Sequence, residues 1–109
     1  MTQTVISLPD VIAQIESLSR QEPKTLLQRT VKMQEEVGEL AQEVLIRERA
    51  SGSQYKEAGA DGILGEATDV IIVALSIFFG EGGTIAELGE RLATKSAKWA
   101  CHQQKKIAE

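Results

Sequence analysis

The chain has 109 residues, long enough for one domain with a modest hydrophobic core and too short for two. Hydrophobic residues make up 42% and charged residues 26% of the chain, a balance that argues against global disorder. The formal net charge of -4 does not favour binding to a nucleic-acid polymer. A small anionic substrate would therefore need a local basic cluster or metal ions.

The sequence indicates a cytoplasmic protein. Cys101 is the single cysteine, which excludes an intrachain disulfide framework and a multi-cysteine zinc site. The first ten residues, MTQTVISLPD, lack a basic start followed by an apolar run, so we expect no secretory signal. The longest apolar run, VIIVALSIFF at 70–79, is much shorter than the stretch of about 20 residues that spans a bilayer, and we expect no membrane partner.

Two helices are predicted in the first half of the chain. The first begins after Ser7, with Asp10 as a possible capping partner, and runs to about Arg20. The second covers residues 24–49, because its apolar residues recur on one side with a period near 3.6. A loop rich in small residues, ASGSQYKEAGADG at 50–62, follows it.

Two more helices are predicted in the second half. The third covers residues 63–79 and is apolar on nearly every side from Val70 onward, so we expect it to be buried all round. Thr84 and Glu87 form a capping box for the fourth, which runs through residue 98 and toward 106. No segment shows a convincing strand pattern. Residues 1–109 are therefore predicted to form a single all-α domain, a small four-helix bundle.

Acidic residues interrupt this apolar pattern in two places. Glu36 and Glu39 lie three residues apart on one face of the second helix. On the third helix, Glu66 and Asp69 share the face that Val73 continues, where the core or an inner cleft should be. A buried carboxylate without a partner is costly, so it protonates, pairs with a base or binds a metal. Convergence of the two pairs would provide four oxygen ligands for Mg²⁺ or Mn²⁺.

Each acidic pair taken alone has a simpler interpretation. An isolated E-x-x-E on a helix is usually a solvated face, and Glu43 is expected to be solvated and to pair with Arg47. Glu66 can be a residue of the first helical turn, favoured there by the helix dipole. Asp69 is harder to explain in this way, because it lies where the apolar run begins. Taken together, the two pairs favour a metal site.

The motifs EEVGE at 35–39 and EATD at 66–69 match E-E-x-x-E followed by E-x-x-D. Over residues 24–99 the chain resembles the MazG-like nucleoside triphosphate pyrophosphohydrolases of the all-α NTP pyrophosphatase superfamily. The resemblance implies hydrolysis between the α and β phosphates of a nucleotide, giving a monophosphate and pyrophosphate. It also implies a helical bundle that is completed as a homodimer or homotetramer.

The resemblance assigns roles to individual residues. It implies Mg²⁺ held by Glu36, Glu39, Glu66 and Asp69, with water attacking phosphorus in line while the metals neutralise phosphate charge. Glu35 occupies the first glutamate of the motif, where it would support the metal ligands or orient the attacking water. The catalytic residues are therefore expected to be Glu35 and Glu36.

Candidate substrate contacts lie on the second and fourth helices. Arg91, Lys95 and Lys98 share one side of the fourth helix, and the resemblance implies phosphate contacts from this region, although lysines near a helix C-terminus are favoured anyway. Trp99 either stacks on a base or packs at a helix end or dimer interface. Lys32 either meets a phosphate or forms a salt bridge with Glu36 four residues on.

Several alternatives stay open at this point. Phosphoribosyl-ATP pyrophosphohydrolases and dimeric dUTPases share the acidic arrangement, but the former typically continue with a tyrosine and a histidine where this chain has Val-Ile-Ile-Val at 70–73. A non-catalytic helical interaction or regulatory module would keep the fold without turnover. The loop at 51–62 is either a lid over the nucleotide or a simple connection.

Overall fold

The structure, a computed structural model, describes residues 5–52 and 55–108. Within these ranges it consists of four helices and contains no strand, which confirms the predicted all-α, four-helix class. The helices are α1 (Leu8–Gln21), α2 (Leu26–Arg47), α3 (Gly62–Gly80) and α4 (Ile85–Ala108). Each observed boundary lies within one turn of a predicted one, and α4 runs through residue 98 and past 106 to Ala108.

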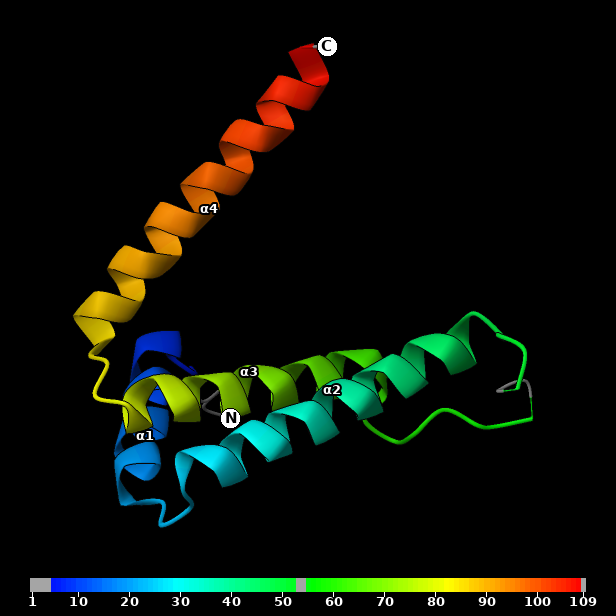
Figure 1. Ribbon diagram of the computed structural model, residues 1–109, viewed down its shortest axis with the longest axis horizontal. Helices are drawn as coiled ribbons and strands as arrows, with labels where there is room; N and C mark the ends of the chain where they lie inside the picture. The colour runs from blue at the N-terminus through cyan, green and yellow to red at the C-terminus, as the bar shows by residue number, and fades with distance from the viewer. Residues whose placement is uncertain (1–4, 53–54, 109) are drawn as a thin grey trace.

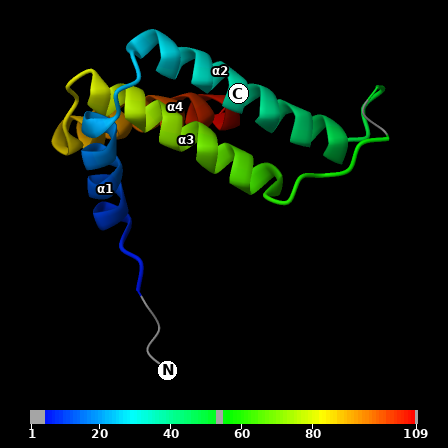
Figure 2. The same ribbon diagram turned by 90° about the horizontal axis from the view of Figure 1, so that it is seen from below.

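Three helices form one body and the fourth projects from it. Helices α2 and α3 run side by side, and α1 crosses one end of this pair, in contact with α3 (Figure 1). Helix α4 leaves from the same end and contacts only α1 among the described helices. The two views together show a V, with α4 as one arm and the α2–α3 pair as the other (Figure 2).

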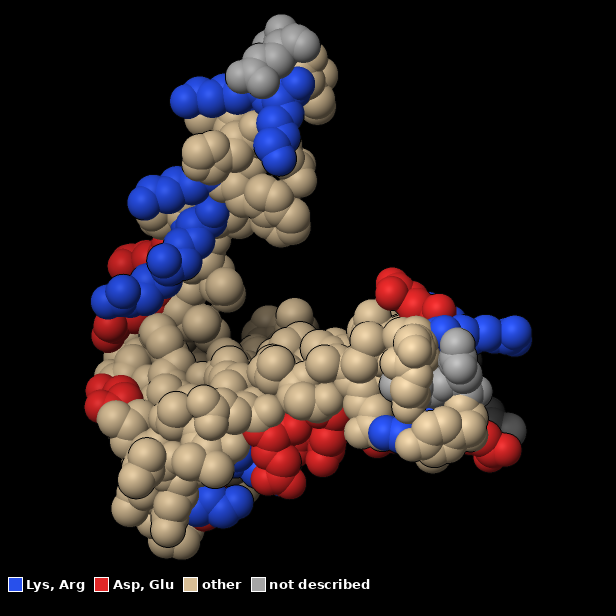
Figure 3. All heavy atoms as spheres, turned by 45° about the vertical axis from the view of Figure 1, so that its right-hand side comes forward, with Lys and Arg blue, Asp and Glu red and all other residues tan. Residues whose placement is uncertain are grey.

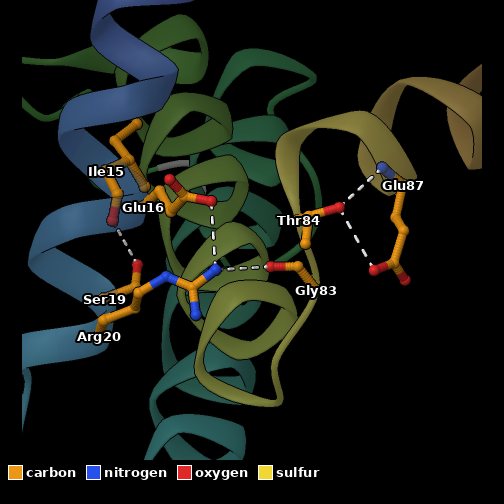
Figure 4. Close-up of polar contacts among 7 residues, drawn as sticks. All are labelled: Ile15, Glu16, Ser19, Arg20, Gly83, Thr84 and Glu87. Carbon is orange, nitrogen blue, oxygen red and sulfur yellow. Dashed lines mark hydrogen bonds and ion pairs between the residues drawn. The ribbon is translucent and has the colours of Figure 1, made fainter.

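Side-chain caps begin two of the helices. The hydroxyl of Thr25 accepts a hydrogen bond from the Gln28 N–H at 3.2 Å, and the Gln28 side chain accepts one from the Thr25 N–H at 3.0 Å. This capping box was not predicted from the sequence. The predicted box at α4 is confirmed in part, because the Thr84 hydroxyl accepts the Glu87 N–H at 3.1 Å (Figure 4). At α1, Ser7 occupies the N-cap position but makes no side-chain capping hydrogen bond.

The hydrophobic core of a single chain is very small. Among the described residues, Phe79 is the one apolar side chain that is fully buried, and it meets Phe78 edge to face with ring centroids 5.5 Å apart. The prediction that α3 is buried all round from Val70 onward is wrong for the single chain, since Ile71 is 57% and Ile72 43% exposed. Helices α1 and α2 cover two sides of α3 and leave a third uncovered.

The end of the bundle is held by a buried arginine. Arg29 of α2 donates hydrogen bonds to the carbonyl oxygens of Ser19 and Glu22, both at 2.9 Å, and to those of Lys24 and Ser76. These carbonyls belong to the end of α1, the loop after it and the last turns of α3, where the helix dipoles concentrate negative charge. One guanidinium therefore ties three helices together.

Helix α3 is also the one described helix that is long and apolar enough to cross a membrane, judged by length and composition alone. The helix is longer than the apolar run at 70–79, because it begins at Gly62. The core helix of a soluble protein has the same length and composition, so this finding alone is weak evidence for a membrane span.

Candidate metal centre

Three of the four predicted metal ligands lie together between α2 and α3. Glu36, Glu39 and Glu66 each offer a carboxylate oxygen, and these oxygens lie within 4.8 Å of one another. Glu36 is 7% exposed, Glu66 is half-buried and Glu39 is exposed. Acidic side chains accordingly gather on one face of the α2–α3 arm (Figure 3). The cluster thus has a buried end and an end open to solvent.

Lys32 neutralises part of this charge. Its Nζ lies 3.1 Å from Oε1 of Glu36 and 3.5 Å from Oε1 of Glu35, one turn before each acid. The hydrogen bond to Glu36 and the negative charge of Glu35 raise the pKa of Lys32. The simpler of the two predicted roles for Lys32, a salt bridge with Glu36, is therefore present.

Two carboxylate oxygens of the cluster are left without a partner. Oε2 of Glu36 and Oε2 of Glu66 are both buried and accept no hydrogen bond from the residues that the structure describes. Burial raises the pKa of the Glu66 carboxyl, and the negative charges of Glu39 and Asp69 raise it further. An unpaired buried carboxylate oxygen is energetically costly, so this pair of atoms calls for a proton or a cation.

Asp69 lies close enough to Glu66 to affect its pKa electrostatically, but it does not belong to the group of three oxygens. It follows Glu66 by three residues on α3 and therefore faces the same side of the helix. Asp69 is half-buried and directly precedes the apolar residues of α3, which begin at Val70.

The donor set fits a hard divalent cation. All of the candidate ligands are carboxylate oxygens, which Mg²⁺ and Mn²⁺ prefer, and no histidine or cysteine lies among them. Mg²⁺ usually keeps several waters and binds through a few carboxylates together with substrate phosphates. The exposed carboxylate of Glu39 leaves room for such additional ligands.

An apolar cavity of about 220 Å³ lies beside the acids, between α1, α2 and α3. Lys32 lines this cavity and also binds Glu36, so the cavity and the cluster share a side chain. Val73, which continues the Glu66–Asp69 face of α3, lines it as well. The cavity is smaller than typical ligand pockets of about 300–1,000 Å³, so it suits one ring system rather than a whole nucleotide.

The remaining predicted site residues lie elsewhere. Glu35 is exposed beside Lys32 at the edge of the cluster. Lys95, Lys98 and Trp99 are exposed on α4, which has no contact with α2 or α3 within the chain. The structure therefore does not bring these three residues to the acids of their own chain. Lys95 and Lys98 line a separate surface groove along α4 with Glu87, Glu90, Arg91 and Thr94.

Sequence reasoning missed the burial of Glu43 and of Arg29. Glu43, expected to be solvated and paired with Arg47, is 9% exposed, and its Oε1 accepts the N–H of Gly59 at 2.8 Å. The predicted solvation was wrong because Glu43 binds the loop that returns the chain to α3. The burial of Arg29 could not be predicted from the sequence, because its partners are main-chain carbonyl oxygens and no sequence pattern identifies them.

Comparisons of the chain with protein-family models, with curated proteins and with solved structures found no match. The family resemblance therefore rests on the two acidic motifs at 35–39 and 66–69.

Proposed function

We infer that this protein is a Mg²⁺-dependent nucleoside triphosphate pyrophosphohydrolase of MazG-like type. The observation that carries this proposal is the pair of buried, unpartnered oxygens, Oε2 of Glu36 and Oε2 of Glu66, in a carboxylate cluster beside an apolar cavity. Neither a solvated acidic face nor a simple structural core accounts for carboxylates placed in this way.

The acids would hold the cation. Glu36, Glu39 and Glu66 are the ligands that geometry supports, and Asp69 is the fourth by its position on α3. Bound Mg²⁺ supplies positive charge that neutralises the phosphates and activates water for attack. In the overall reaction water adds to the α phosphorus, and the bond from that phosphorus to the bridging oxygen breaks. Pyrophosphate leaves and a nucleoside monophosphate remains.

The chain's own residues would position the substrate. The cavity would take the base, since its lining is largely apolar and its volume suits a single ring system. The phosphates would then extend over the exposed end of the cluster near Glu39. Lys32 lines the cavity and holds Oε1 of Glu36, and from this position it would contact a phosphate. Glu35 would restrain Lys32 from the solvent side.

One observation favours a second candidate, a helical interaction module without turnover. Helix α4 projects from the body with its large apolar residues exposed, as expected of a segment that recognises another protein. That module needs no metal and predicts that loss of the acids leaves its function intact. The two candidates can therefore be distinguished by whether the protein catalyses a metal-dependent reaction.

The test is a survey of ribo- and deoxyribonucleoside triphosphates with Mg²⁺ and with chelator. The proposal predicts metal-dependent release of pyrophosphate together with a monophosphate, lost in Asp69→Ala. Phosphoribosyl-ATP and dUTP belong in the survey, because enzymes acting on them share the acidic arrangement. Absence of turnover for every substrate, with Asp69→Ala folded and indistinguishable from the wild type, would leave the interaction module as the better account. We place the proposed activity in the cytoplasm, where nucleoside triphosphates are the natural substrates.

A further inference from the structure

The cavity between α1, α2 and α3 has apolar sides and a polar floor. Ser19 is 4% and Arg29 7% exposed, so these two are among the deepest of the lining residues. Glu22 and Lys24 are exposed and stand at the mouth. The apolar sides are formed by Ile15, Leu18, Ile72 and Val73. A flat ring that enters between these sides would reach the polar floor with its edge.

Ser19 and Ser76 supply the hydroxyl groups of the cavity lining, and each has already committed its proton. The Ser19 hydroxyl donates to the carbonyl oxygen of Ile15 at 2.6 Å (Figure 4), and the Ser76 hydroxyl donates to that of Val73 at 2.8 Å. A hydroxyl has one proton and two acceptor lone pairs. Both serine oxygens can therefore accept a hydrogen bond from a ligand, but neither can donate one without releasing its helix carbonyl.

The charged residues of the lining do not offset this excess of acceptors. The hydrogen bonds of Arg29 all go to main-chain carbonyl oxygens, those of residues 19, 22, 24 and 76. Glu22 adds a carboxylate, which accepts hydrogen bonds and donates none when it is ionised. Lys24 is a donor, but it is exposed, so water competes for its strongly hydrated ammonium group. The floor and one side of the mouth are thus rich in acceptors.

The two serines lie at the end of the cavity away from the candidate metal centre. Ser76 lies about 15 Å beyond Glu66 along the axis of α3, because an α-helix rises about 1.5 Å per residue. Arg29 binds the carbonyl oxygens of both serines, so Ser19 lies at the same end. Lys32, which binds the acids, lines the cavity from α2. A nucleotide with its phosphates at the acids would therefore turn the edge of its base farthest from the sugar toward the serines.

We propose that this cavity selects nucleotides whose base carries an exocyclic amino group on that edge, as in cytosine and adenine, over bases with a carbonyl there, as in uracil and hypoxanthine. The amino group donates two hydrogen bonds, which the oxygens of Ser19 and Ser76 would accept. The carboxylate of Glu22 favours the same bases, because it attracts a donor and repels a carbonyl oxygen. This selection rests on the proposed function, which makes a nucleotide the ligand of the cavity.

A carbonyl oxygen in the same place would be disfavoured. It would set acceptor against acceptor, so the ligand oxygen and both serine oxygens would lack a donor after water has left. A serine that turned its proton toward the ligand would give up its hydrogen bond to Ile15 or Val73. Sites that hydrogen-bond a substrate group discriminate against analogues without that group more strongly than apolar pockets discriminate by size.

The experiment is an NMR titration of the full, isotope-labelled chain with nucleoside monophosphates in millimolar Mg²⁺. Cytidine and uridine monophosphate (CMP and UMP) form one matched pair, and adenosine and inosine monophosphate (AMP and IMP) form the other. We expect the dissociation constants of CMP and AMP to be at least ~10-fold lower than those of UMP and IMP. The amide resonances of Ser19 and Ser76 should shift on binding, as expected for a base at the floor of the cavity.

Two variants test the residues that make the selection. Ser76→Ala removes an acceptor and should weaken the binding of CMP, whereas Glu22→Gln adds a donor and should strengthen the binding of UMP. Each should reduce the preference for CMP to less than ~3-fold. Ser96→Ala is the matched control, because the Ser96 hydroxyl makes the same kind of bond, to the carbonyl oxygen of Ala93 at 3.2 Å, on exposed α4. Ser96→Ala and Glu90→Gln should keep the wild-type preference, and helix content measured by circular dichroism should not change in any variant.

Equal affinities for CMP and UMP, tighter binding of UMP, or no binding of any of these nucleotides would overturn the proposal. An amino preference that both Ser76→Ala and Glu22→Gln leave intact would overturn it as well. Pyrophosphate release from the triphosphates is measured separately, so that the selection and the proposed activity can fail independently. Preferential binding of CMP and AMP without hydrolysis of any triphosphate would remove the activity and keep the selection. Hydrolysis of CTP and UTP with equal binding of CMP and UMP would keep the activity and remove the selection.

Discussion

The ammonium group of Lys32 lies 3.1 Å from Oε1 of Glu36, while Oε2 of the same carboxylate is buried without a partner. One lysine thus satisfies half of a buried acid and leaves the other half available. This division is what a cation site needs, because a carboxylate paired at both oxygens would have nothing to offer a metal.

Removal of Lys32 should destabilise the metal-free protein. In Lys32→Met the buried carboxylate of Glu36 loses its ion-pair partner and the acids repel one another more strongly. The raised pKa of Lys32 stabilises the folded state at pH values below its ordinary pKa, and this stabilisation is lost as the pH rises through the folded-state value. Melting temperatures in chelator should therefore be lower for Lys32→Met at pH 7, and the difference should shrink at a pH above the raised pKa of Lys32. Lys106→Met, an exposed control, should melt as the wild type does at both pH values.

Glu66→Gln should stabilise the metal-free protein. The raised pKa shows that the charged form of Glu66 is disfavoured on folding, so this acid destabilises the folded state at any pH where it is ionised. The penalty disappears as the pH falls below the ordinary value near 4.5. The variant should therefore melt higher than the wild type at pH 8 in chelator, and the difference should shrink toward pH 5.

The same variant should lose its response to metal. Wild-type protein is expected to melt at a higher temperature in millimolar Mg²⁺ because the ion binds the folded state alone. Glu66→Gln should show a much smaller increase, and Glu90→Gln, an exposed change on α4, should respond fully. An equal Mg²⁺ response in Glu66→Gln and the wild type would argue against Glu66 as a ligand.

Arg29 should be the most sensitive position for stability. Arg29→Ala removes a guanidinium that serves carbonyls of two other helices, Ser19 on α1 and Ser76 on α3. The expected loss of unfolding free energy is on the order of 3–5 kcal/mol, because hydrogen bonds to charged groups contribute about 1.5–3 kcal/mol each and are not additive. Urea unfolding would measure it, with Arg47→Ala as an exposed control expected to cost less than about 0.5 kcal/mol.

Glu43 should hold the loop before α3 in place. Glu43→Ala leaves the N–H of Gly59 without its acceptor, so the exchange of that amide hydrogen should become faster while the amides of α3 stay protected. Hydrogen–deuterium exchange with mass spectrometry would show the change. Glu48→Ala, at an exposed position on the end of α2, should leave the loop unaffected; faster exchange there as well would indicate a general loosening of the end of α2.

The sequence predicted the features that depend on local periodicity. It did not predict the burial of side chains, which depends on contacts with other helices. Four helices and the cap at Thr84 follow from spacing and from residue type, and both are present. The acids of α2 and α3 were paired correctly in part, because an i, i+3 spacing defines a face. Which face meets another helix is not a local property, so the exposure of Ile71 and the burial of Glu43 were both missed.

The contacts of Arg29 show most clearly what a sequence pattern cannot predict. Nothing in the sequence distinguishes it from Arg47, an exposed arginine on the same helix. Its role depends on where α1 and α3 end relative to α2, and on the absence of a Cβ at Gly80, where a side chain would collide with the guanidinium. Such positions are set by tertiary packing, which periodicity alone does not reveal.

The proposed binding of Mg²⁺ by the carboxylate cluster, for hydrolysis of a nucleoside triphosphate, can be tested by pyrophosphate release by the wild type, Glu36→Gln and Glu90→Gln. Glu36→Gln keeps the shape of the side chain but removes the charge that a cation needs. We predict Mg²⁺-dependent release by the wild type and by Glu90→Gln, and a loss of at least ~100-fold in kcat/KM for Glu36→Gln, beyond the effect expected for residues that only support a metal ligand. Release that continues undiminished in chelator, or in Glu36→Gln, would show that the cluster does not hold a catalytic metal.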